Sequence, residues 1–225
     1  MQAIAAENNL PATAFVVSAG DGYDIRWFTP AAEIDLCGHA TLASAYVVFN
    51  RLKPGSRSVT FGSRSGALHV SLRDERLAFE LRARPATPCT APAEIDKALG
   101  AAPVQTLHAA VLLAVFDSEA DVRSLVPDMA AMSRVDPHGV IATAPGSDVD
   151  FVCRFFAPNL GVPEDSATGS AHLTLTPYWS ERLGKSALRS RQVSKRGGEL
   201  WCEMAGDRVR IAGYAAPYLE GTIEI

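Results

Sequence analysis

Two short segments of the sequence carry the residues best suited to move protons and to bind an anion. Residues 33–46 read EIDLCGHATLASAY, and residues 164–179 read EDSATGSAHLTLTPYW. Each segment runs from a glutamate through four residues to a glycine, a polar residue and an alanine, and then into a mostly apolar run. This pattern predicts one helix that begins at Gly38 and a second that begins at Gly169.

The first turn of a helix attracts anions, because its N–H groups lack helical partners and the helix dipole is positive there. Two such ends facing one cleft would suit a small carboxylate. Gly38 and Gly169 are therefore candidate substrate-binding residues, since a Cβ would block close approach to the backbone. The alternative is that both glycines only let a helix pack tightly against a strand.

Three residues at these helix ends are candidate catalytic residues. His39 carries an imidazole, the side chain most often used to accept and donate protons. Asp165 precedes the second helix, whose N–H groups would favour a carboxylate, and Ser170 can donate to a substrate oxygen. Alternatively, His39 only hydrogen-bonds locally and Asp165 only caps the helix. His172, one turn into an apolar helix, is expected to be structural.

The residues directly before the two glycines, Cys37 and Thr168, are further candidates for substrate binding. Cys37 adjoins a helix N-terminus, where thiol pKa values fall. The alternative is a buried core cysteine. Glu33 is interpreted as a loop or cap anchor rather than a base.

The similarity between the two segments extends outward. RWFTP at residues 26–30 matches RFFAP at 154–158, and RSGAL at 64–68 matches RGGEL at 196–200. A repeat of roughly 130 residues is far longer than the roughly 20–50 residues of solenoid repeats. The sequence therefore predicts two copies of one supersecondary unit, arranged as paired half-domains.

Periodicity and turn residues divide the chain into an N-terminal lobe at 1–84, a connector with a short helix at 85–103 and a C-terminal lobe at 104–225. The expected fold is α+β: two pseudo-symmetric lobes, each a mainly antiparallel curved sheet wrapped around a central helix. A capping box at Ser118–Asp121 predicts a further helix to residue 126. The central helices are expected at 38–52 and at 169–183, the second bent or interrupted near Pro177. Strands are expected at 13–18, 24–28, 58–62, 67–72, 76–81, 107–116, 139–143, 150–156, 192–194, 199–204, 208–212 and 221–225, the last of which could cross back to the first lobe.

Composition excludes several classes of function. A net charge of −4 gives no basic surface for nucleic acid, and no segment reaches the roughly 18 apolar residues of a membrane span. The first ten residues show no signal peptide. The four cysteines form no CxxC pair, which indicates free thiols in a reducing cytoplasm, and neither they nor the five histidines cluster at metal-ligand spacing.

The motifs resemble those of the phenazine-biosynthesis PhzF-like isomerase family. The resemblance rests on residues 1–10, 26–43, 150–179 and 191–198, which span nearly the whole chain. It implies the diaminopimelate-epimerase-type fold, with the site in the cleft between the lobes, and isomerisation by proton transfer without a cofactor. Homodimers are common in the family. Its site positions correspond here to Gly38, His39, Asp165, Gly169 and Ser170.

The sequence departs from the family pattern in two places. Family members usually begin with a strand and a Gly-Asn-Pro turn before the first helix, whereas this sequence starts at that helix, so a truncated start is expected, with an exposed sheet edge. The family's proton-shuttling glutamate corresponds to Ala12, within Pro11-Ala12-Thr13-Ala14-Phe15. Because an acid/base group contributes roughly 10²–10⁴-fold, activity is expected to be reduced or lost.

Two alternative functions follow. The first is a non-catalytic relative that binds a small carboxylate or serves in dimerisation. The second rests on a weaker likeness to cysteine-dependent proline racemases, whose Cys-Gly-His triplet matches Cys37-Gly38-His39; with Thr168 at the matching second position, only one-base chemistry such as dehydration is available. Loops at 63–66, 145–147 and 159–163 are expected to shape the pocket.

Overall fold

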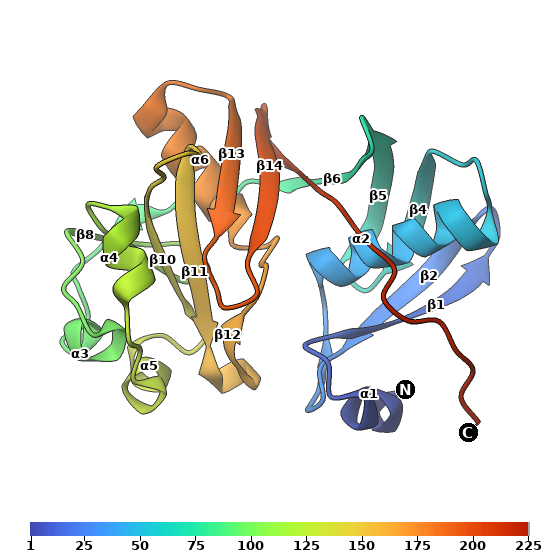
Figure 1. The fold of residues 1–225 in the computed structure, drawn as a ribbon, viewed down its shortest axis with the longest axis horizontal. Coiled ribbons are helices and arrows are strands. Elements are labelled where there is room, and N and C mark those ends of the chain that lie inside the picture. Colours follow the sequence, from blue (N-terminus) through green and yellow to red (C-terminus); the bar gives the residue numbers. More distant parts are fainter. Residues whose placement is uncertain (225) are drawn as a thin grey trace.

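The computed structural model describes residues 1–224. Two lobes lie side by side and share one 15-stranded sheet (Figure 1). Among the helices of residues 1–224, none combines the length and the apolar character that crossing a membrane requires.

The first lobe is built as the alternation of apolar runs and turn residues predicts. Its buried strand residues alternate with exposed ones, as in Val59, Phe61, Leu68 and Val70, which gives each strand one core face. The elements are α1 (Gln2–Asn8), β1 (Thr13–Ala19), β2 (Gly22–Phe28), β3 (Glu33–Ile34), α2 (Gly38–Val47), a π-helical turn η1 (Val48–Leu52), β4 (Ser58–Ser63), β5 (Gly66–Arg73) and β6 (Arg76–Arg82).

The second lobe repeats this order and adds outer helices. Ser118 and Asp121 form the predicted capping box at the start of α4. The elements are β7 (Thr87–Pro88), α3 (Ile95–Leu99), β8 (Gln105–His108), β9 (Leu112–Val115), α4 (Glu119–Ser124), α5 (Met129–Val135), β10 (Val140–Pro145), β11 (Phe151–Ala157), a 3₁₀ turn η2 (Pro158–Leu160), β12 (Val162–Asp165), α6 (His172–Leu183), β13 (Ala187–Gln192), β14 (Gly198–Ala205) and β15 (Arg208–Gly213).

The strand order confirms the duplication. The first copy runs β1-β2-β4-β5-β6 and the second runs in the mirrored order β15-β14-β13-β11-β10, so the copies meet where β6 pairs with β15. In each copy the hairpin's second strand carries a short antiparallel partner, β3 on β2 and β12 on β11. Each also makes one parallel contact, β2 with β4 and β11 with β13. The fold is therefore α+β with two related lobes, as predicted.

The central helices differ in their burial. Only one face of α2 is buried, through Ala40, Thr41, Ser44 and Ala45, although the sequence predicted a central helix around which the sheet wraps. In contrast, α6 buries a nearly continuous run of side chains, and its Trp179 stacks on Phe151 of β11. Helices α3–α5 cover the opposite face of the sheet in the second lobe, around a separate cluster that includes Met132.

Several predicted elements were wrong. Residues 107–116 form the hairpin β8–β9 instead of one strand, because the chain turns at Ala109–Val111 without glycine or proline. The strand expected at 192–194 lies earlier, as β13, and α5 was not predicted at all. Helix α6 begins at His172, three residues after Gly169.

The C-terminal segment returns to the first lobe, but not as the predicted strand. Residues 214–224 have no regular secondary structure, and Ile225 lies outside the described residues. The segment runs past α2 in Figure 1, and Glu220 forms an exposed ion pair with Arg51 of η1 at 3.3 Å. Ala215 packs against the first lobe's core.

Both copies contain the same arginine–glutamate clamp. Arg26 donates to both Glu33 oxygens at 2.7 and 2.8 Å. Arg154 donates to both Glu164 oxygens at 2.8 and 3.0 Å. Each clamp ties the hairpin's second strand to the chain that leads into the glycine motif. Glu33 is thus an anchor, as interpreted from the sequence.

The two clamps predict different stability losses. Arg154 is the more buried arginine, with a side chain 12% exposed against 42% for Arg26, and it also donates to the carbonyls of Val122 and Leu125. We expect Arg154→Met to lower the free energy of unfolding by about 3 kcal/mol, since it leaves a largely buried carboxylate unpaired. Arg26→Met should cost less, because Glu33 keeps Arg64 at 3.0 Å. Urea denaturation measures both, and equal losses would contradict this account.

Candidate active site

One cavity of about 300 Å³ brings the two copies of the motif together. Residues of both lobes line it, including each position expected from the sequence: Ala12, Cys37, Gly38, His39, Asp165, Thr168, Gly169 and Ser170. Its remaining wall is mostly apolar, with Ile34, Leu36, Val111, Phe155, Leu160 and Val162 among its residues. A small hollow with an apolar wall and a few convergent polar groups is the usual form of a small-molecule site.

The two motif glycines lie close together, one from each lobe. A Cβ added to Gly38 would lie 3.5 Å from the Gly169 Cα and 3.0 Å from the Phe79 Cζ, and one added to Gly169 would lie 3.6 Å from the Gly38 Cα. Gly38 therefore has a packing role, but in the contact between the lobes and not in the contact of a helix with a strand that the alternative described. The closeness of the two glycines also places both helix ends at one cavity.

Free amide groups are available at both ends. The first N–H groups of α2, from Gly38 onward, have no helical acceptor. Just before α6 the chain forms a 3₁₀-type turn. In it the His172 N–H donates to the Gly169 carbonyl and the Leu173 N–H donates to the Ser170 carbonyl. The N–H groups of Gly169 and Ser170 precede these bonds. The arrangement can hold an oxyanion between two positive helix ends.

Asp165 is fixed by side chains rather than by a helix. Its carboxylate accepts from the Thr168 hydroxyl at 2.7 Å. Gln192, fully buried on β13, donates to the Asp165 carbonyl at 2.6 Å and accepts from the Thr168 N–H at 2.7 Å. The N-cap alternative therefore does not describe Asp165, which keeps its second oxygen for other partners.

The buried His172 side chain contacts the segment that contains Asp165 and Thr168. Its Nδ1 lies 2.9 Å from the Thr168 carbonyl and its Nε2 lies 2.7 Å from the Ser190 hydroxyl. A neutral ring that donates from Nδ1 and accepts at Nε2 satisfies both contacts. Burial lowers the pKa of His172 to about 4, so the ring is neutral and structural.

This buried histidine predicts a pH dependence of stability. Between about pH 6.5 and 4, His172 becomes protonated in the unfolded chain but stays neutral in the folded chain. The free energy of unfolding therefore falls as the pH falls, by about 3 kcal/mol in all. The variant His172→Gln should lack this component. Denaturation series of both proteins across this range would refute the prediction if they lost stability in parallel.

Cys37 and His39 lie in contact at the end of α2. The Cys37 Sγ is 3.4 Å from the His39 Nε2. Burial raises the pKa of Cys37 to about 12, aided by the charge of Asp165 and opposed by the Ala40 N–H. The sequence-based expectation of a lowered thiol pKa is therefore wrong, because the cost of burying a thiolate exceeds the effect of the helix end.

A protonated thiol should react slowly. In a Cys89→Ser background, which removes the more accessible thiol, we expect iodoacetamide at pH 8 to label Cys37 on the order of 10³-fold more slowly in the native than in the denatured protein. Mass spectrometry of the Cys37 peptide gives both rates. Native labelling as fast as that of an unfolded cysteine would restore the thiolate alternative.

Comparison with known proteins places the chain in a family. The model of the family described as phenazine biosynthesis-like protein matches residues 1–221. The chain belongs to this family. An uncharacterized isomerase of Pseudomonas aeruginosa is 50% identical over 227 residues, covering 100% of this chain and 87% of that protein. A crystal structure of a PhzF-family phenazine biosynthesis protein from Enterococcus faecalis has a TM-score of 0.92 at 43% identity, covering 95% of this chain and 82% of that one.

A more distant neighbour supports the fold alone. A Pseudomonas aeruginosa protein described as a predicted epimerase superposes with a TM-score of 0.69 at 20% identity, covering 95% of this chain and 84% of that one. The phenazine biosynthesis-like chain thus has an epimerase-type architecture.

Among the polar residues of this family member's cavity that sequence reasoning missed are Arg84 and His138. Arg84 follows β6 at the start of the proline-rich connector. His138 follows Asp136, a buried carboxylate that accepts from the His138 N–H at 2.8 Å and contacts the His108 Nε2 at 3.0 Å. Neither belongs to the repeated motif. Within residues 1–224 no group of three or more His, Cys, Asp or Glu side chains is placed to hold a metal ion.

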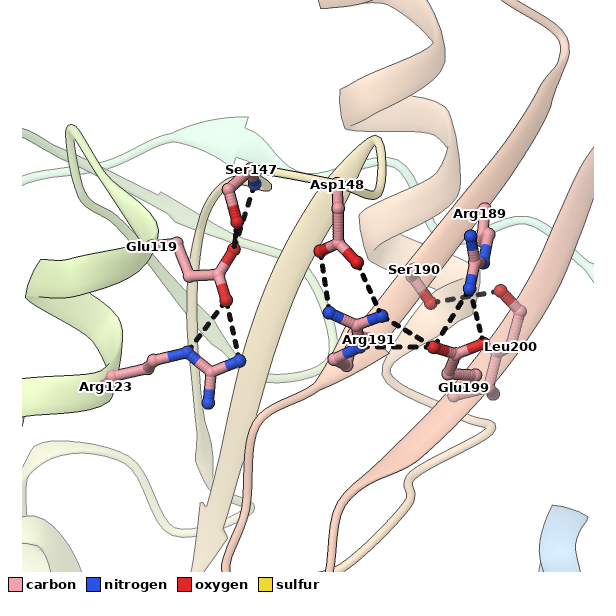
Figure 2. Close-up of polar contacts among 9 residues, drawn as sticks. All are labelled: Glu119, Arg123, Ser147, Asp148, Arg189, Ser190, Arg191, Glu199 and Leu200. Atoms are coloured by element: carbon pink, nitrogen blue, oxygen red, sulfur yellow. Dashed lines mark hydrogen bonds and ion pairs between the residues drawn. The ribbon is translucent and has the colours of Figure 1, made fainter.

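Two of the three loops expected to shape the pocket lie elsewhere. Only the loop at 159–163 contributes, through Leu160 and Val162. Figure 2 shows why the 145–149 loop does not: Ser147 donates to Glu119 of α4, and Asp148 pairs with Arg191 of β13, which also binds Glu199. These contacts fix that loop on the outer surface of the second lobe.

Proposed function

We propose that this protein is an isomerase or epimerase that transfers a proton on a small carboxylate-bearing metabolite, with no cofactor. The observation that carries the proposal is the single cavity where Asp165 and His39 meet two helix ends. Family membership and the isomerase name of the Pseudomonas aeruginosa relative support the same reaction class.

The substrate's carboxylate binds to the N–H groups at Gly38 and at Gly169–Ser170. When the carbon next to it loses its proton, negative charge moves onto the carboxylate oxygens. Donors already aimed at those oxygens stabilise that charge without reorganising. The Ser170 hydroxyl can add a further donor.

Asp165 and His39 divide the proton transfer. The Asp165 carboxylate, oriented by Thr168, accepts the proton from the substrate carbon. His39 delivers a proton to a different carbon or to the opposite face, and the two groups exchange roles in the reverse direction. The substrate thus gains one proton and loses one, so the reaction is an isomerisation.

Ala12 limits the rate. It lines the cavity at the position of the family's proton-shuttling glutamate, and alanine carries no transferable proton. The loss of one acid/base group lowers rates by roughly 10²–10⁴-fold. The same observation favours the second candidate, a relative that binds carboxylates without turning them over.

Solvent deuterium exchange separates these two functions. Small hydroxy and amino acids are incubated with the protein in D₂O, and incorporation at carbon is followed by NMR. We expect slow incorporation that Asp165→Asn or His39→Ala lowers by roughly 10²-fold or more, whereas the control variants Asp148→Asn and His69→Ala, at positions outside the cavity lining, leave it unchanged. Ala12→Glu should raise the rate.

Measurable binding with no exchange of any carboxylate, in the wild type and in Ala12→Glu alike, would refute the enzyme and support the binding protein. The thiol-dependent alternative has its own signature, since Cys37→Ser would then abolish exchange while Ala12→Glu would have no effect.

A further inference from the structure

A proline inside α6 leaves one of that helix's carbonyl groups available to another part of the chain. Pro177 has no N–H group, so it cannot donate to the carbonyl four residues earlier. That carbonyl belongs to Leu173, and it accepts instead from the N–H of Arg84 at 2.8 Å. The connector between the lobes is therefore attached to the first turn of α6.

The backbone of Arg84 is constrained on both sides. The preceding residue, Ala83, donates to the Asp207 carbonyl at 2.9 Å. The following residue, Pro85, restricts the backbone of Arg84 to extended conformations. The side chain of Arg84 thus starts from a fixed point, and it lines the cavity that holds the two motif copies.

Arg84 carries a charge that no other residue of the cavity lining carries. Of the described residues that line the cavity, it is the only one with a permanent positive charge, and Asp165 is the only carboxylate. No ion pair or side-chain hydrogen bond within residues 1–224 engages its guanidinium group, whereas the nearby Arg82 lies 3.8 Å from Asp207. Arg84 is an exposed residue of the cavity lining, so a ligand can reach its side chain.

We propose that Arg84 binds a second anionic group of the substrate, so that the cavity selects small dianions over monocarboxylates. This inference rests on the proposed function, in which the helix ends hold the first carboxylate. A guanidinium fork matches two oxygens of a carboxylate or phosphate at once. Pro177 is a positioning residue, because it keeps the Leu173 carbonyl free to fix Arg84.

Calorimetric titration of the wild type with succinate, phosphoglycolate and butyrate tests the inference. We expect succinate or phosphoglycolate to bind about tenfold more tightly than butyrate, as one charge-assisted contact would give. Whether succinate or phosphoglycolate binds better identifies the second group as carboxylate or phosphate. Arg84→Met should abolish the preference and leave butyrate binding unchanged. Arg82→Met, which removes a neighbouring charge outside the cavity lining, should preserve it.

Pro177→Ala tests the positioning role. Its new N–H competes for the Leu173 carbonyl, so the preference for dianions over butyrate should shrink. A general loss of stability would weaken all three ligands equally and leave that ratio unchanged. In the Arg84→Met background, Pro177→Ala should have no further effect on the ratio.

Equal binding of all three ligands by the wild type, unchanged in Arg84→Met, would overturn the inference while the proposed function stands. Absence of binding by any of them, together with absence of deuterium exchange, would overturn both.

Discussion

The contact between Gly38 and Gly169 sets the distance on which the rest of the site depends. Hydrogen bonding between β6 and β15 joins the lobes along the sheet, and the absence of a side chain at Gly38 lets the two helix ends approach each other beside Phe79. The limits are unequal: a Cβ at Gly38 would press on the Phe79 ring at 3.0 Å, whereas one at Gly169 would make ordinary contacts at 3.6 Å. The first copy therefore constrains the approach of the lobes more tightly than the second.

The duplication explains which features were predictable from the sequence. The arginine, glutamate and glycine of each copy recur because each lobe repeats the same clamp and the same helix end, and such local geometry is encoded locally. Asp165, His39 and their neighbours could be assigned to one cavity because two related lobes place equivalent residues near their common axis. The mirrored strand order follows from the same relation.

The errors arose where a long-range contact decides the outcome. Burial determines the pKa of the Cys37 thiol, and the neighbouring helix end does not. The expected strand at 192–194 misplaced β13 because Arg189 and Arg191 interrupt its apolar pattern, although Leu188 and Ser190, which alternate with these arginines, are buried. Arg84 is held at the cavity by a hydrogen bond from its N–H to the Leu173 carbonyl, which Pro177 leaves free. Arg84 and Pro177 are separated by nearly half the sequence. Periodicity and motif spacing carry none of this information.

Under the proposed function, the alanine at position 12 changes the balance between binding and catalysis. A carboxylate there would add a second negative charge to a cavity whose lining has one, at Asp165, and like charges in a confined site of low dielectric repel each other and an anionic ligand. With alanine there, the cavity lining has one carboxyl group, at Asp165, and one guanidinium group, at Arg84, together with the two helix ends. The ground-state complex with an anion gains from this change, while proton transfer loses one of its groups. Because catalysis depends on stabilising the transition state more than the bound substrate, the proposed function implies that alanine at this position favours affinity and lowers turnover.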